Sequence, residues 1–476
     1  MSRSKSRRRK RSLSGGRGKS FSAIAAHPVR AIVLGFLALI LCRLVVITSL
    51  PSVFALTSPD WALQLNPEHP VALMTKAEQA RTSLIALATE INASAKKNTN
   101  HRPSTKSGTV ARYASSAFSA KDRSRAQQTK ALRAEIRSLA KQIIVNDPLN
   151  ARAFRLLAEV TDDRKRVRIL MQAAAKRSRL ESVAQFWLLN DAFSRKDYAT
   201  ALGHADILLR TRPALTRYVM TYLGQIAENP AGKPLIIKQL ASAPSWRGAF
   251  FRALPRNIHY ANTPLDLMVA LKSTKNPVLV EELNPYLTFL IGKKLIDVAY
   301  NAWLQLLPEK QLATLREIYN PSFERDPTGL PFGWQVKRAK NSSIDYRQKG
   351  AKTRQRALHI GFGAGRVVFP TVSQIIMLAP GRYQFSVAFR GNIKAKRGLR
   401  WRVSCLYKPA QALAETDMLR GKVPTWRTTS LNFTISENGK CKAQTLKLVH
   451  DARSASEEFI SGEVWFDDVK LTRLKN

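Results

Sequence analysis

Tyr383–Phe389 reads YQFSVAF, and its largest apolar side chains stand at every second position. A period of two places these side chains on one face of an extended strand. Similar short segments, separated by Gly, Pro and Asn turns, follow one another after Tyr319: Ala357–Phe362, Gln374–Leu378, Leu399–Leu406, Leu431–Ile435, Thr445–Val449 and Glu463–Leu471. This spacing predicts an antiparallel β-sandwich over residues 320–476.

The ends and the middle of this region resemble the jelly-roll carbohydrate-binding modules that are attached to bacterial xylanases and glucanases. The residues that carry the resemblance are Asn320–Glu324 and Phe332–Trp334 at the opening strand, Leu378–Phe385 in the middle, and Gly462–Val469 at the closing strand. The resemblance implies a jelly-roll fold with a glycan site. Modules of this kind can also lose sugar binding and serve as plain protein-contact domains, and this alternative stays open.

Sugars are held by aromatic rings that pack on their C–H faces and by polar groups that bind their hydroxyls. The glycan-binding candidates are Trp401, Tyr407, Trp426 and Arg390, with Gln374 as a polar partner. Trp401 alternates with two arginines in its strand and could face either way. Trp334 and Trp465 lie inside the end motifs, so we expect both to pack in the core.

The resemblance also implies a structural calcium ion, which requires a cluster of oxygen ligands. Glu324 near the opening strand and Asp468 in the closing strand stand at matching positions. We expect no other cofactor.

Residues 59–319 show helical periodicity, broken by Asn-Pro, Asp-Pro and Arg-Pro pairs. The clearest unit, Gln185–Pro213, resembles a tetratricopeptide repeat (TPR): Asp197-Tyr198 and Ala201 match, whereas Lys196 replaces the usual Gly. Weaker copies follow Asn66 and Asp147 and span Ile291–Pro308. We therefore expect stacked helix pairs whose groove binds partner proteins.

The helical pattern is interrupted over residues 92–121, which are rich in Ser, Lys, Asn and Thr. Such a composition cannot bury enough apolar surface to order itself. We predict a mobile insertion there.

Ala31–Leu50 is an apolar run long enough to cross a bilayer once. Residues 1–30 contain ten Lys or Arg and no Asp or Glu. The positive-inside rule therefore predicts a cytoplasmic basic arm, a single-pass inner-membrane helix at residues 31–50 and a periplasmic remainder. A cleaved signal peptide is the alternative, because Val53 and Ala55 supply small residues for a cleavage site.

Two of the three cysteines, Cys405 and Cys441, lie in the exported part. An oxidising compartment would let them pair, and closing such a loop contributes roughly 3–4 kcal/mol. Two unpaired buried thiols are the alternative.

The net charge of +45 is spread widely, with 28 Lys or Arg against 12 Asp or Glu in residues 320–476. A membrane segment between the basic arm and the rest argues against nucleic acid as a partner. Anionic phospholipid head groups and acidic polysaccharide are the natural partners of an exported basic protein.

We do not expect an enzyme. The seven histidines are scattered, with no HExxH and no Cys-His cluster, and no GxSxG elbow or P-loop occurs. The fold class expected is multidomain α plus β: one transmembrane helix, a TPR-like repeat domain and a C-terminal jelly-roll sandwich.

This architecture predicts a membrane-anchored periplasmic accessory or scaffold protein of a Gram-negative bacterium. It would bind glycan and partner proteins in the biosynthesis or export of cell-surface polysaccharide. The alternative is an envelope-assembly or division scaffold whose sandwich binds protein rather than sugar.

Overall fold

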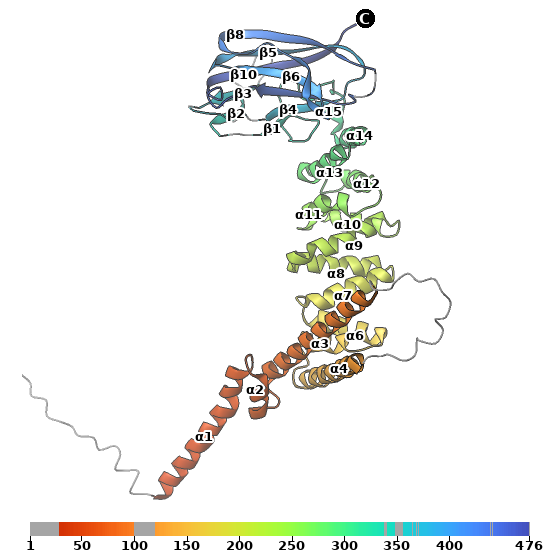
Figure 1. Ribbon diagram of the computed structural model, residues 1–476, viewed down its shortest axis with the longest axis vertical. Helices are drawn as coiled ribbons and strands as arrows, with labels where there is room; N and C mark the ends of the chain where they lie inside the picture. Colours follow the sequence, from red (N-terminus) through yellow and green to blue (C-terminus); the bar gives the residue numbers. More distant parts are fainter. Residues whose placement is uncertain are drawn as a thin grey trace, which may run out of the picture. The chain divides into compact units, whose positions relative to one another are not determined.

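The computed structural model describes residues 28–99, 120–337, 340–347, 356–363, 365–367, 369, 371–437, 439 and 441–475. Within these residues, fifteen α-helices precede ten β-strands (Figure 1). The chain forms two compact units, residues 1–191 and 192–476. The change from helices to strands lies inside the second unit, between Leu312 and Gln335.

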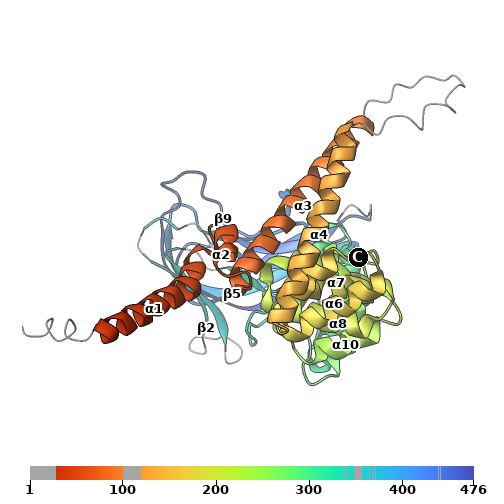
Figure 2. The same cartoon turned by 90° about the horizontal axis from the view of Figure 1, so that it is seen from below.

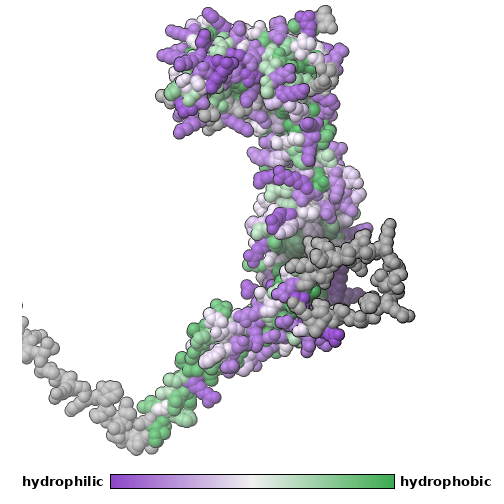
Figure 3. Space-filling view, viewed as in Figure 1, coloured by the Kyte–Doolittle hydropathy of each residue, from purple (hydrophilic) through white to green (hydrophobic). Residues whose placement is uncertain are grey.

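The first unit begins with the apolar helix α1 (Pro28–Phe54). Its span Ile32–Phe54 is long and apolar enough to cross a membrane, and none of the tested window is buried in the protein. Figure 3 shows the surface of this helix as predominantly hydrophobic. By length and composition the helix fits a membrane span, and a signal sequence near an N-terminus fits the same description.

The other helices that lie wholly in this unit are α2 (Pro59–Leu65), α3 (Pro70–Thr99), α4 (Ala120–Asn146), α5 (Ala151–Glu159) and α6 (Arg164–Arg177). Helix α7 (Ser182–Ser194) begins in this unit and ends in the second. The long helices α3 and α4 pack side by side (Figure 2) around Ala77, Ile136 and Ala140. Arg155, which is 4% exposed, forms salt bridges with Glu78 of α3 and with Glu159. This buried cation joins α5 to α3.

The prediction that helical structure breaks at Asn92 is wrong for the first residues of that segment. Helix α3 continues to Thr99, because the Ala and Lys residues between Asn92 and Thr99 favour helix. Helix α4 begins at Ala120. Residues 100–119 of the predicted insertion, and residues 1–27 of the predicted basic arm, lie outside the described residues.

The helices of the second unit are α8 (Tyr198–Thr211), α9 (Thr216–Glu228), α10 (Lys233–Ala241), α11 (Arg247–Ala253), α12 (Thr263–Lys272), α13 (Val280–Gly292), α14 (Ile296–Leu306) and α15 (Glu309–Leu312), with short 3₁₀ helices at Pro213–Leu215 and Leu254–Arg256. Arg247 and Glu282, each 4% exposed, form a salt bridge with an N–O distance of 2.8 Å. It joins α11 to α13.

Both predicted helices of Gln185–Pro213 are helical: α7 ends at Ser194 and α8 begins at Tyr198. Asp197 caps α8 by accepting a hydrogen bond from the Thr200 backbone N–H at 3.2 Å. Lys196 has a φ of 62°, a left-handed conformation that favours glycine, which is the residue expected there in a tetratricopeptide repeat. Membership of that repeat class stays a prediction.

The strands form two antiparallel five-stranded sheets, which confirms the predicted β-sandwich. The first sheet has the order β1 (Gln335–Lys337), β4 (Thr371–Ile376), β9 (Gln444–His450), β6 (Leu399–Cys405) and β7 (Lys408–Glu415). The second has the order β2 (Ser342–Arg347), β3 (Ala357–Phe362), β10 (Ile460–Arg473), β5 (Gly381–Ala395) and β8 (Gly421–Ile435). Trp334, Phe385 and Phe466 are buried in the core of the sandwich.

An aromatic cluster joins α14 to the start of the sandwich. The ring of Trp303 lies 5.5 Å, centroid to centroid, from the rings of Tyr319 and Phe332. All three side chains are buried. The sandwich is therefore packed against the last helices through buried aromatic side chains, in addition to the chain connection.

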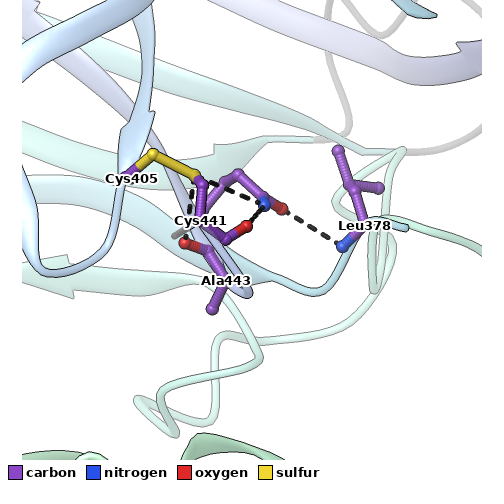
Figure 4. Close-up of a disulfide and its surroundings, with 5 residues drawn as sticks. Leu378, Cys405, Cys441 and Ala443 are labelled. Atoms are coloured by element: carbon purple, nitrogen blue, oxygen red, sulfur yellow. Dashed lines mark hydrogen bonds between the residues drawn. A yellow bond between two sulfur atoms is a disulfide. The ribbon is translucent and has the colours of Figure 1, made fainter. Parts of the chain in front are cut away.

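Cys405 at the end of β6 and Cys441 in the loop before β9 are joined by a disulfide, with a Cα–Cα distance of 5.3 Å (Figure 4). Beside it, the buried Gln444 side chain donates a hydrogen bond to the Cys441 carbonyl at 2.6 Å and accepts one from the Leu378 N–H at 3.1 Å. The disulfide thus lies where strands β6 and β9 of one sheet meet the turn that leads into β5.

Candidate functional site

A row of five side chains crosses the outer face of the second sheet. Along β10, Val464 and Phe466 are buried in the core, so Trp465 between them points outward. Trp465 stands opposite His359 of β3 and Arg390 of β5, and His359 stands opposite Asp345 of β2. Trp426 of β8 completes the row against Arg390. We call Asp345, His359, Trp465, Arg390 and Trp426 the outer row.

His359 is held between two carboxylates. Its Nδ1 lies 3.3 Å from Asp345 Oδ1, and its Nε2 lies 3.1 Å from Glu463 Oε2. The residue is 2% exposed, and its ring centroid is 4.5 Å from that of Trp465. These contacts fix the orientation of the imidazole and hold Asp345 and Glu463 in place.

Arg390 lies between two tryptophans. Its guanidinium carbon is 4.8 Å from the ring centroid of Trp465 and 5.5 Å from that of Trp426. Such cation–π contacts restrain the guanidinium plane. Among the described residues, the buried Nε atom of Arg390 has no hydrogen-bond partner, and neither has the buried Nε1 atom of Trp465.

An open hollow of about 690 Å³ adjoins the outer row on the same face. Its lining includes Asn341, Ser343, His359, Gly361, Asn392 and Glu463. Gly361 has no side chain to fill this hollow. A Cβ at this position would lie only 2.8 Å from Ser343 Oγ, so any larger residue would crowd the space. We call this space the polar hollow. Its amides, hydroxyls and carboxylate are groups that can bind the hydroxyls of a sugar.

Two of the glycan-binding candidates are brought together in the outer row. Arg390 and Trp426 come from neighbouring strands and are in contact. Trp465 was expected in the core, and this expectation is wrong: the side chain is partly exposed on the outer face. The alternation of Val464 and Phe466 around it could have placed it outside.

Trp401 cannot be a glycan contact, which corrects the sequence-based prediction. It is 0% exposed, and its ring lies 5.5 Å from that of Phe466 and 5.9 Å from that of Trp334. A sugar cannot reach a ring that is enclosed by other side chains. Its neighbours Arg400 and Arg402 face outward, where both bind Glu415.

Gln374 has a structural role, so its assignment as a glycan partner is also corrected. The side chain is 1% exposed. Its Oε1 accepts a hydrogen bond from the Tyr319 N–H at 3.0 Å, and its Nε2 donates one to the Tyr319 carbonyl at 2.9 Å. Both ends of the amide are therefore used to hold the segment that enters the sandwich.

Tyr407 lies in the loop between β6 and β7, on the other sheet from the outer row. It is 43% exposed, and its hydroxyl donates a hydrogen bond to the carbonyl of Ile291 at 3.0 Å. Partial burial, with the nearby Asp297 carboxylate, raises the pKa of this hydroxyl. Its position places it at the end of α13, so the structure does not bring it together with Arg390 and Trp426.

The predicted calcium ligands belong to segments that do meet. The Val469 N–H donates a hydrogen bond to the Pro321 carbonyl at 3.0 Å, so the opening and closing segments lie side by side. Asp468 Oδ2 accepts a hydrogen bond from Lys470 Nζ at 3.0 Å. Among the described residues no group of three His, Cys, Asp or Glu could hold a metal, so a calcium ion would also need backbone or amide carbonyls or water as ligands. The calcium ion stays a prediction.

A second hollow of about 410 Å³ lies where α12, α13 and α14 meet the start of the sandwich. Its lining is mostly apolar and includes Val278, Leu279, Leu283, Trp303, Leu307 and Leu330. Leu279 is 58% exposed at its rim. We call it the apolar hollow.

No family model matches the sequence, and no curated protein matches it either. Similar solved structures include a CBM4 structure at 15% identity, which covers 33% of this chain and 99% of its own, with a TM-score of 0.25. Another is TmCBM61 in complex with β-1,4-galactotriose, at 16% identity. It covers 34% of this chain and 100% of its own, with a TM-score of 0.24. A third is the CBM22-1 xylan-binding domain from Paenibacillus barcinonensis Xyn10C, at 13% identity, 33% and 92% coverage and a TM-score of 0.24. A proposal about function must therefore rest on the residues of the outer row and the polar hollow.

Proposed function

We propose that the β-sandwich binds glycan on the outer face of its second sheet, in the polar hollow and along the adjoining outer row. The observation that carries this proposal is the hollow itself. It combines polar side chains with a position, Gly361, that has no side chain, and the ring of Trp465 contacts His359 of its lining. Asp345 and Glu463 are both engaged by His359. We therefore propose binding without catalysis.

The apolar helix α1 supports a second part of the proposal, in which the protein is anchored in the bacterial inner membrane with its N-terminus in the cytoplasm and its bulk in the periplasm. The ten basic residues before the apolar run favour this orientation. A sandwich held at the membrane would gather a glycan near the proteins that make or move it. The proposed role is accessory scaffolding in cell-surface polysaccharide biosynthesis or export, with TPR-like helices binding partner proteins.

The apolar hollow favours a second candidate function, an envelope scaffold whose principal ligand is a protein. Its exposed Leu279 and Val280 are typical of surfaces that bury a partner's side chain. In that case Leu279→Glu should abolish co-purification of partner proteins while glycan binding is unchanged. Retention of the same partners by this variant would contradict the scaffold function.

Filling the polar hollow should weaken glycan binding. In Gly361→Val the new side chain would occupy the hollow and press on Ser343 Oγ, while valine suits a strand. We expect affinity for any polysaccharide that binds the full chain in detergent to fall about tenfold or more, which corresponds to roughly 1.4 kcal/mol. Binding would be measured against acidic and neutral polysaccharides at low and high salt.

The matched control is Ser430→Val, which adds similar bulk at an exposed position of β8. It should bind as the unmodified protein does. Hydrogen exchange of β3 and β10 would show that both variants keep the fold. Unchanged binding by Gly361→Val would place the glycan elsewhere and overturn the proposal.

Membrane anchoring predicts a simple fractionation result. The full chain should stay with membranes after washing with high salt or alkaline carbonate, because the apolar span is held by the hydrocarbon core and not by charge. Added protease should digest it in spheroplasts but not in intact cells. Release as a soluble periplasmic protein with a new N-terminus after α1 would show instead that α1 is a cleaved signal.

A further inference from the structure

The guanidinium of Arg390 is a cation without a counterion among the described residues. No ion pair or hydrogen bond joins it to a carboxylate, and its contacts are the rings of Trp426 and Trp465. By contrast, Arg400 and Arg402 on the outer face of the other sheet share Glu415 and Asp451. Arg400 and Arg402 thus have carboxylate partners, whereas Arg390 has none among the described residues.

The contacts of Arg390 suit the capture of a carboxylate. The two indole rings restrain the guanidinium, so less side-chain freedom is lost when a planar anion binds to its fork of N–H donors. The rings also displace water from part of the cation, which strengthens an ion pair relative to one in bulk solvent.

Arg390 lies close to the polar hollow along β5. Asn392, which lines the hollow, lies two residues beyond Arg390 on the same face of β5. Two residues of a strand span roughly 6.8 Å, which is comparable with the length of one pyranose. A sugar in the hollow would therefore place the next sugar of the chain beside Arg390.

The hollow itself disfavours a carboxylate. Glu463 lines it, and Asp345 lies on the other side of the His359 ring. A carboxylate brought close to Glu463 would be repelled. The hollow therefore suits an uncharged sugar, whereas the adjoining position at Arg390 suits an acidic one.

We propose that the ligand of this face is an acidic polysaccharide with spaced carboxylates, whose uronate-type carboxylate binds Arg390 while a neighbouring uncharged sugar occupies the polar hollow. This inference rests on the proposed glycan function and adds the chemical class of the ligand. It also predicts an order of preference: an alternating polymer, in which every second sugar is acidic, binds more tightly than a polymer in which every sugar carries a carboxylate.

The test uses the full chain in detergent at physiological ionic strength, with three probes: hyaluronan, which alternates acidic and uncharged sugars, its carboxyl-reduced form, and polygalacturonate. Unmodified protein should bind hyaluronan about tenfold or more tightly than the other two. Arg390→Gln should lose about tenfold or more of its hyaluronan affinity, as expected for a lost charge-assisted contact. Its affinity for the carboxyl-reduced polymer, which offers no carboxylate to Arg390, should fall much less.

Lys447→Gln is the matched control, because it removes the same charge from an exposed position on the first sheet. Arg390→Lys keeps the positive charge but lacks the paired N–H donors of a guanidinium, so it should lose part of the affinity for hyaluronan. An equal loss in Arg390→Gln and Lys447→Gln would reduce the effect to general charge attraction and overturn the inference. Normal binding of both hyaluronan and its carboxyl-reduced form by Arg390→Gln would also overturn the inference. In that second case the effect of Gly361→Val still decides separately whether the hollow binds glycan.

Discussion

Replacing Trp401 by alanine is expected to destabilise the sandwich by about 3–5 kcal/mol, the range for removing a large buried aromatic side chain. Trp401 is fully buried and touches aromatic rings from both ends of the sandwich sequence, Trp334 and Phe466. Its removal would leave a cavity that the surrounding strands cannot close. The effect should be on folding, and sugar binding should be lost only as far as the fold is lost.

Because the chain has two compact units, a single melting curve would mix their transitions. Hydrogen exchange of the core strands β5, β6 and β10 isolates the sandwich. Trp426→Ala is the informative comparison, since its side chain lies on the outer face in contact with Arg390. This variant should keep the protection of those strands and bind glycan more weakly. If Trp401→Ala kept full protection and lost binding alone, the burial of Trp401 would be contradicted.

Removing the disulfide with Cys405→Ser and Cys441→Ser together should cost roughly 3–4 kcal/mol. The two residues are 36 positions apart, and the chain-entropy model gives that magnitude for a loop of this length. The cross-link also lies near contacts with the last helices: Tyr407 binds the Ile291 carbonyl, and Lys442 lies 3.4 Å from Asp297. Loss of the disulfide should therefore also increase hydrogen exchange where α13 ends and α14 begins.

The measurement is again hydrogen exchange, here of β6, β9 and the end of α13 at Ile291, with and without reductant. Reductant should act on the unmodified protein as the double substitution does and should not affect the double variant further. Cys42→Ser serves as the control, because Cys42 is an exposed free thiol in α1. Equal protection in all forms would show that the cross-link does not stabilise the sandwich.

Periodicity was enough to predict where helices give way to strands and where seven of the strand segments lie, but not β1, β2 or β7. The alternation in Tyr383–Phe389 and the similar short segments predicts strands, because a side chain's face in a sheet changes at every residue. All of these segments lie wholly or largely within strands of the sandwich. The apolar run Ala31–Leu50 predicts a long exposed helix for the same kind of reason, since length and hydrophobicity are local properties.

Residue types were a weaker guide to the site. Trp401, Trp426 and Trp465 have the same chemistry, yet one is enclosed in the core and two lie on the outer face. For Trp465, the apolar neighbours Val464 and Phe466 indicate an outward side chain, but the position of Trp465 inside the closing motif suggested core packing. Gln374 has the right chemistry for a sugar hydroxyl, but both ends of its amide are bound to Tyr319.

The sequence by itself determined the change from a helical region to a β-rich region, the apolar helix and the sandwich character of the C-terminal region, because these follow from patterns within a few residues. The tertiary structure alone decided which residues share a surface. The outer row takes one residue from each of five strands that are up to 120 residues apart in the chain, from Asp345 to Trp465. Strand order and register set such neighbours, and both depend on how the whole sheet buries its apolar face.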